Sequence, residues 1–231
     1  MEWVIGSRAR LRKTTRTDLT MRLLLVRHGA TFENEQKRYI GQTDVALSPL
    51  GESQAALLGA NLANQTIDLI VTSNLKRARA TAEAIARYHT VPLESDADLR
   101  EINRGIWEGA TYAEVQEHHA ELLARWRHTP AECQIPGGET LFQLRDRAAR
   151  ALERWYVDAP AATVVWVTHA GVIQVVLCHL LDVNLNSWRQ FRRDNASITP
   201  VRVERVDGKL VGSIETATES IKPRADNVHA L

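Results

Sequence analysis

Three short runs of the chain are almost continuously apolar, and they constrain the fold more than any other feature of the sequence. They are residues 21–27 (MRLLLVR), 67–72 (IDLIVT) and 163–168 (TVVWVT). A strand with one solvated face alternates apolar and polar residues, whereas a parallel strand covered on both faces is apolar throughout. The three runs therefore predict buried parallel strands in a sheet with helices on both faces.

The segments between these runs supply the predicted helices. Ser48, Pro49 and Glu52 form a typical helix start, with an N-cap, a first-turn proline and an acidic first turn. Further helices are predicted from Ser73 onward, over 111–127, over 139–157 with one apolar face, and over 171–181, and a hairpin over 201–206 and 209–214 around Asp207-Gly208. We predict a single domain of the α/β class: a three-layer αβα arrangement whose sheet is doubly wound and mostly parallel.

The ends of the chain differ from this middle part. Residues 1–20 are basic with only a short apolar run, which predicts a flexible extension ahead of a second possible start at Met21. Residues 216–231 lack apolar periodicity and are predicted to be a loose tail. Residues 21–215 remain as the folded domain.

Charge and cysteine content limit the partners. The chain has 29 Lys and Arg against 28 Asp and Glu, a formal net charge of +1, which gives no broad field for nucleic acid or an anionic membrane. Any anionic ligand must therefore be held by a local cluster. Cys133 and Cys178 form no CxxC motif, and no stretch approaches the ~20 apolar residues of a membrane span, so a cytoplasmic protein is predicted. A homodimer is left open.

Each predicted strand is followed directly by polar residues. RHGAT (27–31) follows the first, TSNLKR (72–77) the second, and His169-Ala170-Gly171 the third. Ligands of such sheets bind beyond the carboxyl ends of the strands, so two histidines and at least one arginine should converge there. An RHG tripeptide alone arises by chance in about one or two chains per hundred of this length. Its position indicates a phosphoryl site, since arginine matches phosphate oxygens and histidine can be a nucleophile or a cation near neutral pH.

Five motifs extend this pattern over about residues 21–180. LLLVRHGATFENEQKRYIGQTDVALSPLGESQA, TSNLKRARATAEAI, LREINRGIWEG, PGGET and VTHAGVI occur in this order, and together they resemble the histidine phosphatase superfamily in its phosphoglycerate-mutase-like branch. The resemblance implies that His28 is a nucleophile forming a phosphohistidine and that Glu101 is the proton donor. It also implies a phosphate-binding set of Arg27, Arg77, His169 and Asn34, to which we add Thr31, Gln42, Thr43 and Ala170 as candidate substrate-binding residues.

The implied roles agree with the chemistry of phosphoryl transfer, which mainly requires alignment and neutralisation of charge on the equatorial oxygens. Two guanidiniums and an imidazolium at His169 would supply that charge. His28 must be neutral at its attacking nitrogen, so we expect its other nitrogen to donate to a nearby backbone carbonyl. No cofactor and no metal are expected, because no Asp/Glu cluster accompanies these residues to hold Mg²⁺. His118 and His119 are adjacent and do not form an i, i+4 metal pair.

Other functions fit less well. Neither GxxxxGK[ST] nor GxGxxG is present, and Ser53 in GESQA lacks the strand and the final glycine of a nucleophile elbow. A catalytically inactive binding protein of the same fold is the non-enzyme alternative, and the joint presence of the five catalytic candidates argues against it. A phosphoglycerate mutase is the alternative within the family. His169 follows Glu101 by only 68 positions (169 − 101), a spacing that resembles short phosphatases such as α-ribazole phosphatases and broad-specificity monoesterases. We therefore predict a metal-independent phosphatase of a small phosphomonoester.

The sequence does not identify the leaving group. Positions expected beside the pocket, and so candidates for specificity, are Glu33, Gln42, Thr43, Arg104, Trp107, Trp126 and Cys133. Trp107 and Trp126 either stack on a flat ligand or belong to the core.

Overall fold

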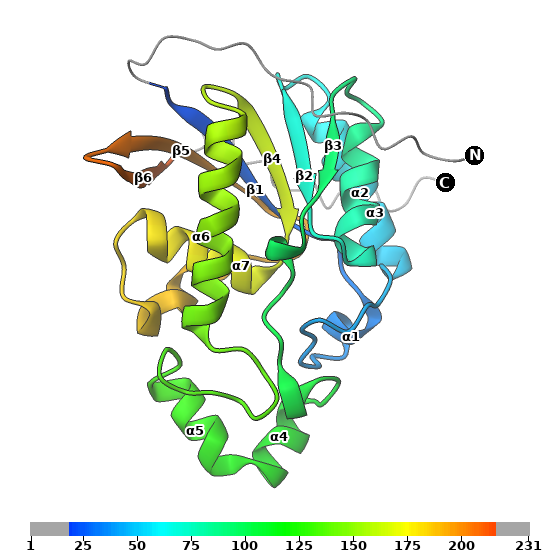
Figure 1. Cartoon of the computed structure of the whole chain (residues 1–231). Helices are drawn as coiled ribbons and strands as arrows, with labels where there is room; N and C mark the ends of the chain where they lie inside the picture. The colour runs from blue at the N-terminus through cyan, green and yellow to red at the C-terminus, as the bar shows by residue number, and fades with distance from the viewer. Residues whose placement is uncertain (1–18, 216–231) are drawn as a thin grey trace.

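The computed structural model describes residues 19–215 and contains one sheet of six strands (Figure 1). The strands are β1 (Met21–Arg27), β2 (Leu69–Thr72), β3 (Leu93–Ser95), β4 (Thr163–Thr168), β5 (Ile198–Val206) and β6 (Lys209–Ile214). They lie in the order β3-β2-β4-β1-β5-β6, with β1 to β4 parallel and β5 antiparallel to both β1 and β6. The predicted α/β class is confirmed. The predicted tail, and the predicted extension except positions 19 and 20, lie outside the described residues.

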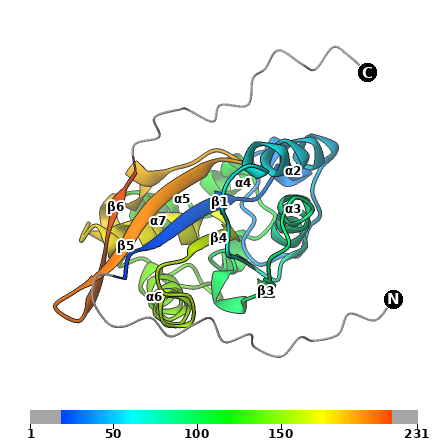
Figure 2. The ribbon, with the colours of Figure 1, turned by 90° about the horizontal axis from the view of Figure 1, so that it is seen from above.

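Helices cover both faces of the sheet, as Figure 2 shows from above. α2 (Pro49–Leu62) and α3 (Lys76–Ala86) pack on one face, and α6 (Leu141–Asp158) and α7 (Ala170–Leu180) pack on the other. Successive side chains of a strand point to opposite faces. Leu24 of β1 therefore belongs to the core under α2 and α3, whereas Leu23 and Leu25 belong to the core under α6 and α7. This double burial explains why the strands are apolar throughout, and it confirms the three layers.

Side-chain caps fix where the helices begin. Ser48 Oγ accepts a hydrogen bond from Gly51 N at 3.2 Å, which confirms the predicted start of α2. α6 begins two residues later than predicted, because Thr140 is its N-cap and forms a capping box with Gln143. α3 begins at Lys76 rather than near Ser73, whose Oγ accepts from Leu75 N in the turn before the helix.

A helical cap lies beyond the carboxyl ends of the parallel strands (Figure 1). The prediction of one helix over 111–127 is wrong: α4 (Tyr112–His118) and α5 (Ala120–His128) are separated by a break at His119, which has φ −141° and ψ 38°. A single straight helix of this length would extend about 25 Å. The break instead lets α5 turn back, so that Leu123 and Trp126 are buried against the core. No glycine or proline marks the break in the sequence.

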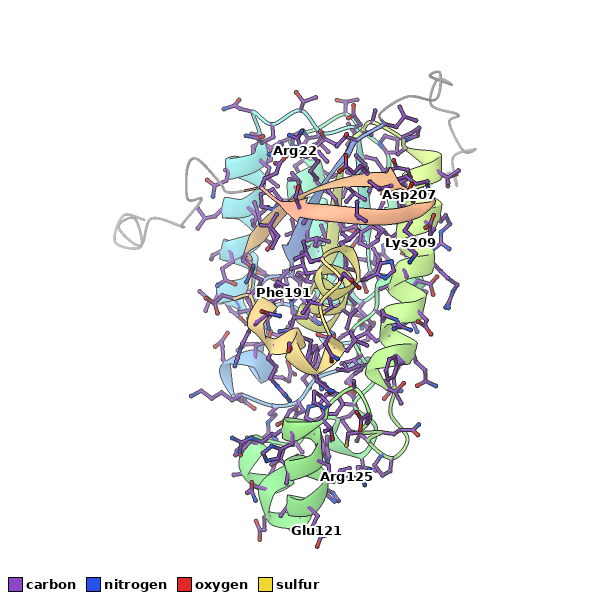
Figure 3. All side chains as sticks on the ribbon, turned by 90° about the vertical axis from the view of Figure 1, so that its left-hand side faces the viewer. Arg22, Glu121, Arg125, Phe191, Asp207 and Lys209 are labelled. Carbon is purple, nitrogen blue, oxygen red and sulfur yellow. The ribbon has the colours of Figure 1, made fainter. Side chains whose placement is uncertain are left out.

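Short elements without a periodic pattern are absent from the sequence-based prediction. They are β3 and the 3₁₀ helices η1 (Ala97–Leu99), η2 (Gly105–Trp107) and η3 (Leu185–Phe191). The predicted hairpin is confirmed as β5 and β6, with Asp207 and Gly208 at positive φ in the turn. In Figure 3 the hairpin crosses the upper part of the molecule, and Phe191 of η3 lies between it and the cap. Within residues 19–215 no single helix is long and apolar enough to cross a membrane; α7 and η3 meet that criterion only together, as a pair bent by 116°.

Candidate active site

The three strand ends meet, as the sequence predicts. Arg27 and Thr168 are paired in register at the ends of β1 and β4. The residues that follow them, His28 and His169, are buried, and their ring centroids are 5.0 Å apart. β2 adds Ser73, whose Oγ lies 2.9 Å from His169 Nε2. The carboxyl ends of β1, β2 and β4 therefore form one buried cluster around two imidazoles.

The ring of His28 is held in one orientation. Its Nδ1 lies 2.7 Å from the carbonyl oxygen of Gly29, a contact that assigns the proton to Nδ1 and confirms the expected carbonyl partner. Nε2 therefore keeps its lone pair, towards which Arg77 Nε donates at 3.3 Å. Burial, and then the positive charges of Arg77 and Arg27, lower the pKa of His28 well below its usual value. The ring is thus neutral near pH 7, as a nucleophile requires.

Two buried guanidiniums flank the imidazoles. Arg77, in the first turn of α3, donates to Thr43 O at 2.9 Å and to Gly41 O at 2.7 Å. Arg27 donates from Nη1 to a backbone carbonyl at 2.7 Å, while its Nε is buried and has no hydrogen-bond partner within residues 19–215. Burial lowers the pKa of both arginines, and the nearby charge of Glu101 opposes this effect. Both remain cations and can neutralise an anion.

His169 differs from the sequence-based expectation in its charge. Its Nδ1 is buried and has no hydrogen-bond partner in the described part of the chain. Burial, followed by the charges of Arg77 and His28, lowers the pKa of His169 well below its usual value. Without a bound anion, the His169 ring is therefore neutral rather than an imidazolium. A phosphoryl anion beside the ring would act in the opposite direction and favour the protonated form.

Glu101 is fixed at both its carboxylate and its backbone. The carboxylate accepts hydrogen bonds from Ile102 N at 2.8 Å and from Gly171 N, in the first turn of α7, at 3.1 Å. A Cβ atom at position 171 would clash with Glu101 Oε1, so any larger residue there would have to displace the carboxylate. The Glu101 carbonyl accepts from Gln42 Nε2 at 3.1 Å and from Arg147 Nη2 at 3.0 Å. The structure therefore holds this carboxylate at the first turn of α7, which directly follows His169.

The loop after β1 closes one side of the cluster. Thr31 is the N-cap of α1 (Phe32–Glu35), and Asn34 completes the capping box. Asn34 Oδ1 accepts from Asn195 Nδ2 at 3.1 Å, and the same nitrogen donates to His28 O at 3.1 Å. Sequence reasoning missed Asn195, because a loop residue before β5 belongs to no motif or periodic pattern.

Gln42, which is partly buried, and Thr43, which is exposed, make hydrogen bonds that support the site. Thr43 Oγ1 donates to Glu108 Oε2 at 2.8 Å, and the backbone amides of Gly41 and Gln42 donate to the same carboxylate. Burial alone would raise the pKa of Glu108. These hydrogen bonds, with one more from Arg104 N, instead hold that pKa below its usual value. The loop that binds Arg77 is thereby anchored to η2. Thr43 therefore serves this anchor, and Gln42 serves Glu101.

The remaining specificity candidates separate into two groups. Trp107, Trp126 and Cys133 are buried in the main core. Of the two roles considered for the tryptophans, a place in the core is therefore the one observed. Arg104 lies instead against aromatic rings next to Glu101, and Glu33 lies partly buried in the first turn of α1. Ala170 follows His169 directly and begins α7, where backbone amides lack intrahelical acceptors.

A cavity of about 470 Å³ opens behind Glu101. Gln42 and Arg147, which both bind the Glu101 carbonyl, line it, whereas neither His28 nor His169 does. Among residues 19–215, no group of three or more His, Cys, Asp or Glu side chains is arranged to hold a metal ion.

Comparison with known proteins decides the family. A model described as the histidine phosphatase superfamily (branch 1) matches residues 23–215. The chain belongs to this superfamily. Phosphoserine phosphatase 1 of Hydrogenobacter thermophilus is a histidine phosphatase relative with 34% identity over 184 residues, which cover 80% of this chain and 87% of the relative.

Two further matches concern glucosyl-3-phosphoglycerate phosphatases. The protein from Mycolicibacterium vanbaalenii is 33% identical over 174 residues, 72% of this chain and 77% of its own length. A solved structure of the mycobacterial enzyme with VO3 has a TM-score of 0.77 at 28% identity and covers 84% of this chain and 97% of that one. Together these findings confirm a histidine phosphatase, a hydrolase that acts on small phosphorylated metabolites.

Proposed function

We propose that this histidine phosphatase hydrolyses its substrate through a phosphohistidine formed on His28 Nε2. The observation that carries the proposal is the 2.7 Å hydrogen bond from Nδ1 to the Gly29 carbonyl. It leaves Nε2 as the unprotonated nitrogen, and the lowered pKa of the buried ring keeps it so near pH 7. A neutral imidazole held in a fixed orientation is a suitable nucleophile for phosphorus.

In the first step, Nε2 attacks phosphorus and the bond from phosphorus to the alcohol oxygen breaks. Arg27, Arg77 and His169 bind the equatorial oxygens, where negative charge accumulates. Glu101 gives its proton to the leaving oxygen, so that an alcohol departs rather than an alkoxide. Asn34 adds a further contact: its amide oxygen is held by Asn195, which leaves its amide nitrogen as the donor.

In the second step, water attacks the phosphohistidine. The Glu101 carboxylate takes a proton from the water, a phosphorus–oxygen bond forms, and the phosphorus–nitrogen bond breaks. Phosphate leaves, His28 regains its lone pair, and Glu101 is protonated again for the next cycle. Thr31 and the Ala170 amide complete the substrate-binding set at the two helix starts that border the cluster.

The substrate is a small phosphomonoester, and residues 21–215 form the catalytic domain. The family match over 23–215 supports these limits. Phosphoserine, the substrate in the name of one relative, is both a phosphate ester and a carboxylic acid. The cytoplasmic location, the homodimer and the absence of nucleic-acid and membrane partners stay predictions.

The test is His28→Ala assayed with p-nitrophenyl phosphate and with an alkyl phosphate. The variant should lose turnover and the acid-labile phosphoenzyme, with its circular dichroism unchanged. His118→Ala is the matched control, because it removes an exposed imidazole from the cap. Substantial activity in His28→Ala would show that the nucleophile is another residue.

Two further assays separate this proposal from its alternatives. With 3-phosphoglycerate and a catalytic amount of 2,3-bisphosphoglycerate, a phosphatase releases phosphate or is inactive, whereas a mutase forms 2-phosphoglycerate. Activity should also survive EDTA, because the cations of the proposed site are side chains. A requirement for added divalent metal would contradict the mechanism.

A further inference from the structure

The guanidinium of Arg104 has donors that no group among residues 19–215 accepts. Its Nε and Nη1 are both buried and lack a hydrogen-bond partner in this part of the chain, although the residue as a whole is only partly buried. Buried charged donors are normally paired, and leaving them unpaired costs stability. Arg104 is therefore a partly exposed cation whose two inner donors have no partner among residues 19–215.

Aromatic rings hold this guanidinium in place. Its central carbon lies 5.8 Å from the ring centroid of Tyr39 and 5.4 Å from that of Trp126. Trp107 links the two walls, with centroids 5.4 Å from Tyr39 and 6.1 Å from Trp126. Rings attract the face of a guanidinium but accept none of its N–H groups. The rings thus fix the direction of the Arg104 N–H groups but accept no hydrogen bond from them.

The nearby acids are already engaged. Glu101 accepts from Ile102 N and Gly171 N, and Glu108 accepts from backbone amides, including that of Arg104. Burial lowers the pKa of Arg104, and Glu101 is the opposite charge that acts on it most strongly. Among these aromatic rings, an apolar side chain would fill the position at lower cost. A purely structural role does not explain an arginine here.

The position of Arg104 relative to Glu101 indicates which part of a ligand it meets. Arg104 follows Glu101 by three residues, and its backbone is tied by Glu108 to the loop that anchors Arg77. Glu101 is the residue proposed to protonate the leaving oxygen. Arg104 therefore lies on the side of the leaving alcohol, while Arg27 and Arg77 serve the phosphoryl group.

We propose that Arg104 binds a second anionic group, a carboxylate or a phosphate, on the alcohol part of the substrate. The fork of an arginine matches two oxygens of either group, and a charged pair on partly dry aromatic walls is stronger than one in water. This inference rests on the proposed function and makes phosphorylated acids or bisphosphates the favoured substrates of that site.

The test compares substrates that differ only in the second anion. 3-Phosphoglycerate against glycerol 3-phosphate replaces a carboxylate by CH₂OH, and fructose 1,6-bisphosphate against fructose 1-phosphate tests a phosphate. In the wild type the anionic member should have the higher kcat/KM in at least one pair. Arg104→Met should reduce that preference roughly 10- to 100-fold, the range expected for a hydrogen bond to a charged group. Arg104→Lys, which keeps the charge and loses the fork, should reduce it less.

Arg125→Met is the matched control. It removes the same charge from the neighbour of Trp126 on α5, and Figure 3 shows Arg125 on the outer part of the cap. The preference should be unchanged in this variant. Thermal unfolding separates this role from a structural one, because loss of a structural arginine would lower the Tm. The Tm of Arg104→Met should equal or exceed that of the wild type, because a buried unpaired cation is removed.

Equal kcat/KM for both members of both pairs in the wild type would overturn the inference. So would an unchanged preference in Arg104→Met together with a lower Tm, which would show a structural arginine. The proposed function fails separately, when His28→Ala keeps its turnover of p-nitrophenyl phosphate. p-Nitrophenyl phosphate has no second anion, so the loss of its turnover in His28→Ala does not test the role of Arg104.

Discussion

Replacing Arg147 should reveal how the catalytic carboxylate is kept in position. Its guanidinium donates to three carbonyls of the segment that carries Glu101: to Asp98 O at 2.6 Å, to Arg100 O at 2.5 Å and to Glu101 O at 3.0 Å. It also forms a two-point ion pair with Glu139, with contacts of 2.7 and 2.8 Å. Arg147→Met removes all five contacts and keeps most of the apolar stem.

The magnitude follows from burial. The side chains of Arg147 and Glu139 are only 10% and 14% exposed, so the substitution leaves Glu139 as a nearly buried, unpaired charge. Breaking such a pair typically costs about 3–5 kcal/mol of unfolding free energy. At about 2–4 °C per kcal/mol for a domain of this size, the Tm should fall by roughly 6–20 °C. Arg150→Met, one turn further along α6, is the control: its side chain is 64% exposed and 3.6 Å from Asp98, a contact worth at most about 1 kcal/mol.

Catalysis should change in a way that simple loss of stability does not produce. Without Arg147, the Glu101 carbonyl keeps a single hydrogen bond within the described residues, the one from Gln42, so the proton donor is less well placed. At a temperature where the variant is fully folded, kcat on alkyl phosphates should fall more than kcat on p-nitrophenyl phosphate, whose leaving group departs without a proton. Urea unfolding and parallel kinetics measure both effects. The reasoning is refuted if Arg147→Met and Arg150→Met lie within 1 kcal/mol of each other, or if both substrates are affected equally.

Four further predictions concern the cluster itself. Because the pKa of His28 is lowered, phosphorylation in single-turnover experiments, corrected for substrate ionisation, should decline only below pH 6.5; a midpoint at or above 6.5 contradicts the assignment. Because folding lowers the pKa of both His28 and His169, the unfolded state binds more protons than the folded state. The stability that is present above about pH 6.5 should therefore be lost as the pH falls towards the folded pKa values, and the Tm should fall with it. Glu101→Gln should slow alkyl phosphate hydrolysis by roughly 10²-fold or more and aryl phosphorylation by less, and equal losses would remove Glu101 from the acid role. Gly171→Ala should displace the Glu101 carboxylate and show the same alkyl-selective loss, whereas an unaffected enzyme would show that the carboxylate is free to move.

The sheet was predictable because its signal is local. Each of β1, β2 and β4 is buried on both faces, and burial is recorded directly as a continuous apolar run. β3 gave no such signal, since Leu93–Ser95 is an exposed edge strand of three residues. The break at His119 was equally hidden, because it depends on where the core lies relative to α5 and not on a helix-breaking residue.

The site residues that lie in sequence motifs could be predicted, whereas those that act through contacts with backbone groups could not. His28, Arg77, Glu101 and His169 all occur in motifs that the resemblance identifies. Arg147 acts mainly through carbonyls of residues nearly fifty positions away, which no sequence pattern encodes. The signal that would have found it is a charged residue among the inward positions of an amphipathic helix, because such a residue needs a buried partner.

The charge arrangement explains how a chain with a net charge of +1 can handle anionic substrates. Glu101 is the strongest opposite charge acting on each of Arg27, Arg77 and Arg104, so these three guanidiniums share one main counter-charge. The remaining positive charge is concentrated where water is largely excluded, so a phosphoryl dianion gains more there than at the surface.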